Sequence, residues 1–314
     1  MRKINPVYIR GIKSRMRGVR APIIISVYLG IVLAFFALVY TGMSNEMGYG
    51  SLARPATLGS YMLETLYIIL VIILFAVIAL MVPAMNAGTI AAEREKQTLD
   101  LMLCSPLSAS KIIMGKLLSN LTFVTFLLML VLPFFAIIYL FGTVSIGNML
   151  MLMLFMLVSA YACASVATFY SCLVKRTSVA TILSYVTLLL FVIATMIIGF
   201  ILNSIHLEQY YMNPNPVSPV DTYIPFVWRI NPVLGAMELA IGGATGRQMM
   251  NPGVPYSSGY YGYIGGIGTI VSIVNNNGMY SHLYSAGFMV VISVILNICS
   301  ASLIKPVNKL SIVK

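Results

Sequence analysis

Ala91-Ala-Glu-Arg-Glu-Lys-Gln-Thr-Leu-Asp-Leu-Met-Leu-Cys-Ser-Pro-Leu-Ser108 is the most charged segment of a chain that otherwise carries little charge. It separates two long apolar runs, at about 61–85 and 112–141. An Arg, Lys or Asp side chain at the centre of a bilayer costs about 2.5–3.5 kcal/mol. We therefore expect the segment to leave the membrane between two spans.

The segment also has the pattern of a helix. Leu99, Met102 and Leu103 recur at a spacing of three and four residues, which predicts one apolar helical face. Ser105-Pro106 ends that helix, because a residue before proline is driven out of the α region. The sequence thus predicts a short amphipathic helix at the membrane surface.

The composition is that of a membrane protein. Hydrophobic residues make up 60% of the chain and charged residues only 9%, whereas soluble domains carry about 25% charged residues. We predict an all-α polytopic membrane protein, a single domain over 1–314, because bilayers are crossed by helices of about 20 apolar residues. Six spans are expected, at about 22–41, 61–85, 112–141, 148–174, 179–203 and 281–304.

The net charge of +11 is distributed as in a membrane protein and not as in a nucleic-acid-binding protein. With six spans, sixteen of the 19 lysines and arginines lie on the side of the termini, and three, Arg54, Arg229 and Arg247, lie on the other. Positively charged loops stay in the cytoplasm. We expect a plasma-membrane protein with both termini in the cytoplasm, where the basic stretch 1–21 is either an interfacial helix on anionic lipid or a disordered anchor.

The stretch 204–280 is expected to be an extracytoplasmic loop rich in Pro, Asn, Gly and Tyr. Within it, 226–244 is apolar enough to suggest a seventh span. Its seven strongly apolar residues contribute about −3.5 kcal/mol, whereas Arg229 and Glu238 cost about 6 kcal/mol together. We therefore predict an interfacial or re-entrant helix that starts near Asn231-Pro232.

Residues with catalytic potential are scarce. The chain contains neither the G-x-x-x-x-G-K-[ST] phosphate loop nor an H-E-x-x-H motif, so we expect no enzyme activity and no cofactor in this chain. The four cysteines show no metal-ligand spacing, and no disulfide is expected. His206 and His282 are expected to be interfacial. Glu64, near the outer end of the second span, is either a pathway residue or a headgroup contact.

The stretch from Glu93 to Ser108, followed by Lys111-Ile-Ile-Met-Gly-Lys116, resembles the ABC-2 family of ABC transporter permease subunits. Asn5-Pro6, the run from Arg15 to Arg20, and Asn231-Pro-Val-Leu-Gly235 are similar to the N-terminal helix and an outer-loop segment of that family. The resemblance implies six spans per subunit and two permease subunits, identical or different, around one pore. It also implies a separate ATPase subunit that holds ATP and Mg²⁺, and export across a prokaryotic inner membrane.

The same resemblance makes the helix between the second and third spans the coupling helix that docks the ATPase. A helix of mixed charge at the membrane surface suits that role: its apolar face would fill a groove in the partner, and its charges would set the register. Lys175 and Arg176 form a second inner loop. The predicted docking residues are Glu93, Arg94, Glu95, Gln97, Thr98, Leu99, Met102 and Leu103.

Two other classes of function remain as alternatives. An ion-coupled secondary transporter usually carries ionisable residues at mid-membrane, and the middles of the six predicted spans contain none. An intramembrane enzyme would need catalytic side chains that meet within the spans, and no such set can be placed. The residues do not identify the transported substrate.

Overall fold

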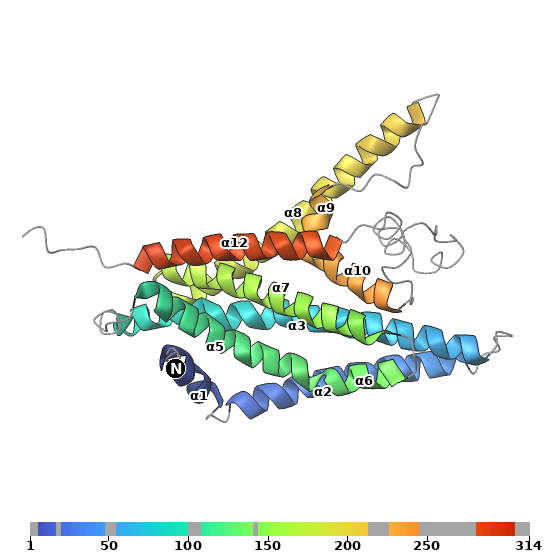
Figure 1. Cartoon of the computed structure of the whole chain (residues 1–314), viewed down its shortest axis with the longest axis horizontal. Coiled ribbons are helices and arrows are strands. Elements are labelled where there is room, and N and C mark those ends of the chain that lie inside the picture. The colour runs from blue at the N-terminus through green and yellow to red at the C-terminus, as the bar shows by residue number, and fades with distance from the viewer. Residues whose placement is uncertain are drawn as a thin grey trace, which may run out of the picture.

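The computed structural model describes residues 6–16, 20–47, 55–99, 108–140, 144–212, 226–244 and 281–304. Within these ranges the chain is helical apart from short turns, and no strand is present. Figure 1 shows the helices as a bundle. They are α1 Pro6–Met16, α2 Arg20–Met47, α3 Pro55–Glu95, α5 Ala109–Leu130, α6 Leu132–Leu140, α7 Ile146–Leu173, α8 Thr177–Met212, α9 Phe226–Ile230, α10 Pro232–Ala244 and α12 Ser281–Ile304.

Five stretches of helix among the described residues are long and apolar enough to cross a membrane. They are Leu66–Glu95, Ala109–Leu140, Ile146–Leu173, Thr177–Leu202 and His282–Ile304. The apolar part of α2, Pro22–Leu38, is shorter. An all-helical membrane protein is thus confirmed for the described residues, and six remains the predicted number of spans.

α7 lies at the centre of the bundle between α3 and α12 (Figure 1) and packs most extensively against these two helices. Its small side chains are the reason. Ser159, Ala160, Ala164 and Ser165 are buried, and small residues let helix backbones approach closely in lipid. The largest cluster of buried apolar residues joins α7 to α2, α3, α5, α6 and α10.

Two helix boundaries differ from the predicted spans. The second span was expected to end at about 85, but α3 continues through Pro83 as far as Glu95. Its last five residues, Ala91 to Glu95, consist of Ala, Glu and Arg, which are strong helix formers. The fifth span was expected to end at about 203, but α8 continues to Met212. Residues 204–212, which were expected to begin the outer loop, are therefore helical.

The helix of the third predicted span is interrupted at Val131, two residues before Pro133. α5 ends at Leu130 and α6 begins at Leu132, with Val131 between them. Pro133 has no N–H and its ring conflicts with the carbonyl of the preceding turn. The Val131 N–H accordingly bonds the nearer carbonyl of Leu128, at 3.2 Å.

The predicted helix after Asn231-Pro232 is confirmed as α10. Asn231 is its N-cap, since its side-chain oxygen accepts the N–H of Val233 at 2.9 Å, and Pro232 fills the first helical position. The Asn231 amide also donates to Thr195 Oγ1 of α8 at 2.7 Å. α10 packs against α3, α7 and α12, and its position relative to the membrane, interfacial or re-entrant, stays a prediction.

The predicted N-terminal helix is present as α1. Tyr8 and Ile12 are half-buried, while Arg10 and Lys13 are exposed. The buried side packs on α5, where the hydroxyls of Tyr8 and Thr122 are 3.1 Å apart. α1 therefore rests on another helix and presents its cations outward, which agrees with an interfacial position.

One end of the bundle carries most of the described cations, and we call it the basic end. The end of α3, the starts of α5 and α8 and the ends of α7 and α12 meet there (Figure 1). Its lysines and arginines are Arg10, Lys13, Arg94, Lys96, Lys111, Lys116, Lys175 and Arg176. The loops that the charge pattern assigns to one side of the membrane thus share one end of the molecule.

Glycine makes room for a tryptophan where α8 meets α9. A Cβ built on Gly199 would lie 1.7 Å from Nε1 of Trp228, whose side chain is 1% exposed. Trp228 Nε1 donates to the Met196 carbonyl at 3.4 Å. The contact therefore depends on the missing side chain at Gly199.

Gly199→Ala is expected to destabilise the protein by about 1–3 kcal/mol, because the new methyl group overlaps the indole ring. The measurement is the apparent midpoint of thermal unfolding in mild detergent. The matched control is Gly30→Ala in α2, whose Cβ would meet nothing within 4 Å. It should leave the midpoint unchanged or raise it, since Ala favours a helix over Gly. Equal midpoints for the two variants would contradict the packing described.

Candidate functional site

The predicted docking segment begins with a tight helix end. α3 stops at Glu95 and the chain turns at Lys96 and Gln97, which are exposed. The Thr98 N–H bonds the Glu93 carbonyl at 2.9 Å and the Gln97 N–H bonds the Arg94 carbonyl at 3.2 Å. This pair of bonds is the Schellman pattern. Gln97 occupies its left-handed position, with a φ of 55°.

Glu93 ties this helix end to α5. Its carboxylate accepts a short hydrogen bond from the Thr98 hydroxyl and lies 3.3 Å from Nζ of Lys116. Lys116 also donates to the Thr89 carbonyl at 2.6 Å. Both charged side chains are half-buried, so the pair is weakly screened by water and fixes α5 beside the last turns of α3.

Arg94 points to the end of α7. Its guanidinium donates to the carbonyl of Val174, the C-cap of α7, at 3.5 Å. A cation at this place is favoured by the negative end of the α7 dipole. Arg94 thus links α3 to α7.

Glu95 reaches the start of α8. Its carboxylate accepts the Thr177 N–H at 2.8 Å and the Thr177 hydroxyl at 3.2 Å. The positive end of the α8 dipole favours a carboxylate here. Three successive side chains, from Glu93 to Glu95, therefore contact three different helices.

These contacts explain how Glu93 and Glu95 are tolerated in the last turn of α3. Acidic side chains in the last turn of a helix are opposed by the helix dipole, by about 0.3–1 kcal/mol each. In α3 the Glu93 carboxylate is offset by Lys116, and the Glu95 carboxylate by the N-terminus of α8. The two glutamates are stabilised by tertiary contacts, although they oppose the local preference of their own helix.

Buried polar contacts extend the same junction into the bundle. The Asn120 amide donates to the Asn86 side chain at 2.7 Å, and both residues are fully buried. The Ser171 hydroxyl of α7 accepts the backbone N–H groups of Ile90 and Ala91, each at 2.9 Å. The last three turns of α3 are therefore fixed to α5 and α7 at defined positions along each helix.

The remaining predicted docking residues are placed as follows. Leu99 is half-buried and packs against the cluster of Ile90, Ile113, Cys172 and Ile304, so it faces the bundle. Met102 and Leu103 lie outside the described residues. Lys175 and Arg176 are exposed in the turn between α7 and α8, and the Glu95–Thr177 contact brings that turn beside Lys96 and Gln97.

Several residues of the junction were not predicted as site residues. Lys116 was named only as the end of the family motif, and Asn86, Asn120, Ser171 and Thr177 were given no role. A sequence signal existed for some of them: an Asn or a Lys in an apolar run needs a partner within the protein. It does not say which partner the residue finds.

Glu64 lies within α3, and its side chain is outside the described part of the structure. His282, which was expected to be interfacial, is 4% exposed in the first turn of α12, and its place relative to the membrane stays a prediction. Its backbone N–H donates to the Glu238 carboxylate at 2.9 Å, and its Nδ1 lies 3.5 Å from that carboxylate. The two residues join α10 to α12 at the end of the bundle opposite the basic end.

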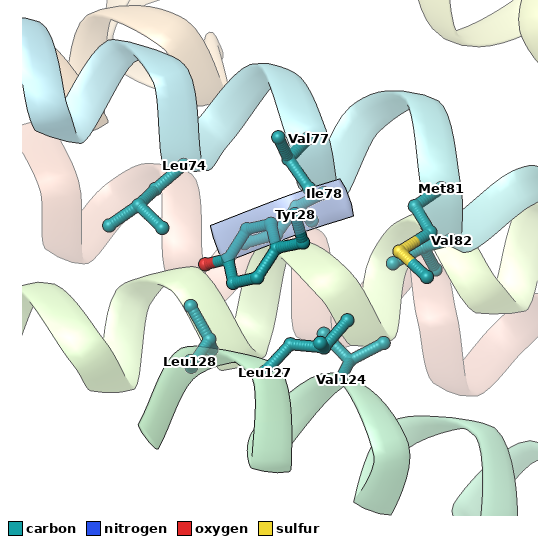
Figure 2. A pocket seen from close by; sticks show the side chains of 9 residues that line it. All are labelled: Tyr28, Leu74, Val77, Ile78, Met81, Val82, Val124, Leu127 and Leu128. Atoms are coloured by element: carbon teal, nitrogen blue, oxygen red, sulfur yellow. The ribbon is translucent and has the colours of Figure 1, made fainter. Parts of the chain in front are cut away.

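A small cavity lies between α2, α3 and α5 (Figure 2). Its volume is about 10 Å³, and its lining, to which Tyr28 contributes its ring, is apolar. A water molecule needs about 10–15 Å³ and two or more polar partners. The cavity is therefore a packing defect and not a passage for a substrate.

The chain matches the model of one protein family, described as ABC-2 family transporter protein, over residues 44–301. This range is more than half of the chain and contains the whole junction at the end of α3. Comparison with curated proteins finds no significant match.

Gln97→Gly is expected to stabilise the protein by roughly 1 kcal/mol, because a side chain in the left-handed conformation is strained and glycine is not. The apparent midpoint of thermal unfolding should rise by about 1–3 °C. Gln97→Ala is the matched control, since it removes the side chain but keeps the Cβ that causes the strain. If both variants unfold at the same temperature, the strain at Gln97 is not what the φ of 55° indicates.

Proposed function

The chain belongs to the ABC-2 family of transporter proteins, and from that premise we propose that it is the permease subunit of an ATP-driven exporter. A separate ATPase subunit would bind ATP and Mg²⁺ and hydrolyse the nucleotide. This chain would supply part of the translocation pathway and the surface on which the ATPase docks, and no catalytic residue.

The observation that carries the proposal is the junction at the end of α3. An exposed turn, Lys96–Gln97, directly follows three side chains that contact α5, α7 and α8. A partner bound at this turn would be linked to three helices by an ion pair and hydrogen bonds. Such a link passes movement better than a flexible loop would.

The docking surface in this proposal consists of two neighbouring turns. Lys96 and Gln97 form one, and Lys175 and Arg176 form the other. Four adjacent exposed residues, three of them cationic, suit an acidic groove on the partner, since complementary charge steers association and fixes register. Met102 and Leu103 remain predicted contributors.

The pore would need a second permease subunit. α8 exposes an apolar face of Ile182, Val186, Leu189, Ile193, Ile197 and Ile201, which lipid or a second permease would cover. The cavity in Figure 2 is too small for any substrate. Six spans, a prokaryotic inner membrane and cytoplasmic termini complete the proposal, with the basic end facing the cytoplasm.

An ion-coupled transporter is the alternative. Of the described ionisable pairs, Glu93–Lys116 lies where α3 ends, at the basic end of the bundle, and Glu238–His282 lies where α12 begins, at the opposite end. Ion-coupled transporters bind their ions near the membrane midplane. The positions of these two pairs therefore favour the ATP-driven exporter.

The test of the docking surface is co-purification of the ATPase. Lys96→Glu combined with Lys175→Glu and Arg176→Glu should reduce the ATPase that purifies with the tagged chain by about tenfold or more, because three attractive charges become repulsive. The amount of bound partner and the ATP hydrolysis of the preparation are both measured in mild detergent.

Lys13→Glu, an exposed charge reversal on α1, is the matched control and should leave the bound ATPase unchanged. Full binding by the triple variant would remove the docking surface from the proposal. A wild-type chain that purifies without any ATPase, and transports only when an ion gradient is present, would replace the exporter by the ion-coupled alternative.

A further inference from the structure

α8 differs from the other long helices in what holds it to the chain. Its buried residues within the described part are Ala180, Ser184, Thr195 and Gly199, which are all small or polar. Its large apolar side chains are half-buried or exposed. By contrast, α7 buries Leu152, Phe155 and Met156, and α5 buries Phe123, Leu127 and Leu128.

Polar contacts at separate points along α8 accompany a few apolar ones, such as Phe191 on Phe288 of α12 and Phe200 on Trp228 of α9. Near its start, Thr177 bonds Glu95. Further along, the Tyr185 hydroxyl donates to the Leu80 carbonyl of α3, and the Thr187 hydroxyl donates to Tyr170 of α7 at 2.8 Å. About half-way along α8, Thr195 bonds Asn231. A helix whose buried side chains are small or polar can pivot more easily when one contact moves.

The contact with Glu95 provides a hydrogen-bond acceptor at the N-terminus of α8, where the N-cap side chain of α8 itself has none. The first helical carbonyl is that of Arg176, which accepts the Ala180 N–H at 3.1 Å, so Arg176 is the N-cap. A guanidinium has no acceptor and cannot cap a helix start. The Glu95 carboxylate, from another helix, instead accepts the N–H of Thr177, the first residue of α8.

Glu95 is also the last residue of α3, directly before the exposed turn Lys96–Gln97. A displacement of that turn moves the Glu95 carboxylate. Because this carboxylate is hydrogen-bonded to Thr177, the start of α8 moves with it. The two residues before Glu95, Glu93 and Arg94, contact other helices. Glu93 and Arg94 contact α5 and α7. These two helices are held in the core by their own large buried side chains.

We infer that Glu95 is the positioning residue that transmits movement of the ATPase-docking turn to α8. The inference rests on the proposed function, because it takes the turn at Lys96–Gln97 as the place where the partner acts. It adds that α8, rather than α5 or α7, is the helix that moves when the partner binds ATP.

The test measures the position of α8 in the complete complex of chain and ATPase, reconstituted in lipid nanodiscs. Spin labels are placed at Val179→Cys on α8 and Ile298→Cys on α12, which are 41% and 65% exposed, with the native cysteines replaced by alanine. Labelled chain is diluted with unlabelled chain, so that distances within one chain are observed. The distance is recorded without nucleotide and with Mg-ATP and vanadate.

The wild-type complex should show a shift of the distance with Mg-ATP and vanadate. In Glu95→Ala the shift should fall by at least half while ATP is still hydrolysed, because the link to α8 is lost but the docking turn remains. Ser178→Ala, the next and exposed residue of α8, is the matched control and should keep the full shift. If Glu95→Ala does not assemble, Glu95→Gln decides, since it keeps the shape and removes the charge.

An unchanged shift in the Glu95 variant overturns the inference. So does a wild-type complex that hydrolyses ATP without any shift, and in that case the proposed function stands. If no ATPase binds the wild-type chain, the proposed function fails, and the inference fails with it.

Discussion

The interior of a bilayer offers no hydrogen-bond partner, so each polar side chain within it must find its partner in the protein. In this chain that constraint decides where helices meet. Asn120 of α5 bonds Asn86 of α3, Asn148 of α7 bonds the Leu239 carbonyl of α10, and Asn231 bonds Thr195 of α8. Apolar side chains can slide along one another at little cost, but these bonds exist at one register only. The asparagines therefore set the register between neighbouring helices, and the apolar side chains pack at that register.

The junction at the end of α3 applies the same rule to charges. Successive residues of a helix point about 100° apart around its axis, so Glu93, Arg94 and Glu95 cannot share one face. The sequence interpretation assigned all three to one partner surface, and that assignment stays a prediction. The structure gives each of them a partner within the chain, on α5, α7 and α8. The residues that follow, Lys96 and Gln97, are exposed, and the proposed docking surface includes them.

The class of fold and most helix positions could be predicted, because apolar length and proline position act locally. The break before Pro133 and the start of α10 at Asn231-Pro232 are examples. The second span was expected to end at about 85 and the charged run to leave the membrane; α3 continues as one helix to Glu95, and the position of the membrane boundary stays a prediction. Lys116 and Thr177 could not be predicted as partners of Glu93 and Glu95. Those pairs depend on how helices far apart in sequence meet, which no local pattern contains.

α8 is longer than the membrane that it would cross. Its apolar stretch of 26 residues, Thr177–Leu202, measures about 39 Å at 1.5 Å per residue, whereas the hydrocarbon core of a bilayer is about 30 Å thick. Such a hydrophobic mismatch is relieved by tilting the helix, and Figure 1 shows α8 inclined to its neighbours. The tilt of a helix attached at few points follows bilayer thickness. The lipid composition of the membrane therefore acts on the same helix as the contact with Glu95 does.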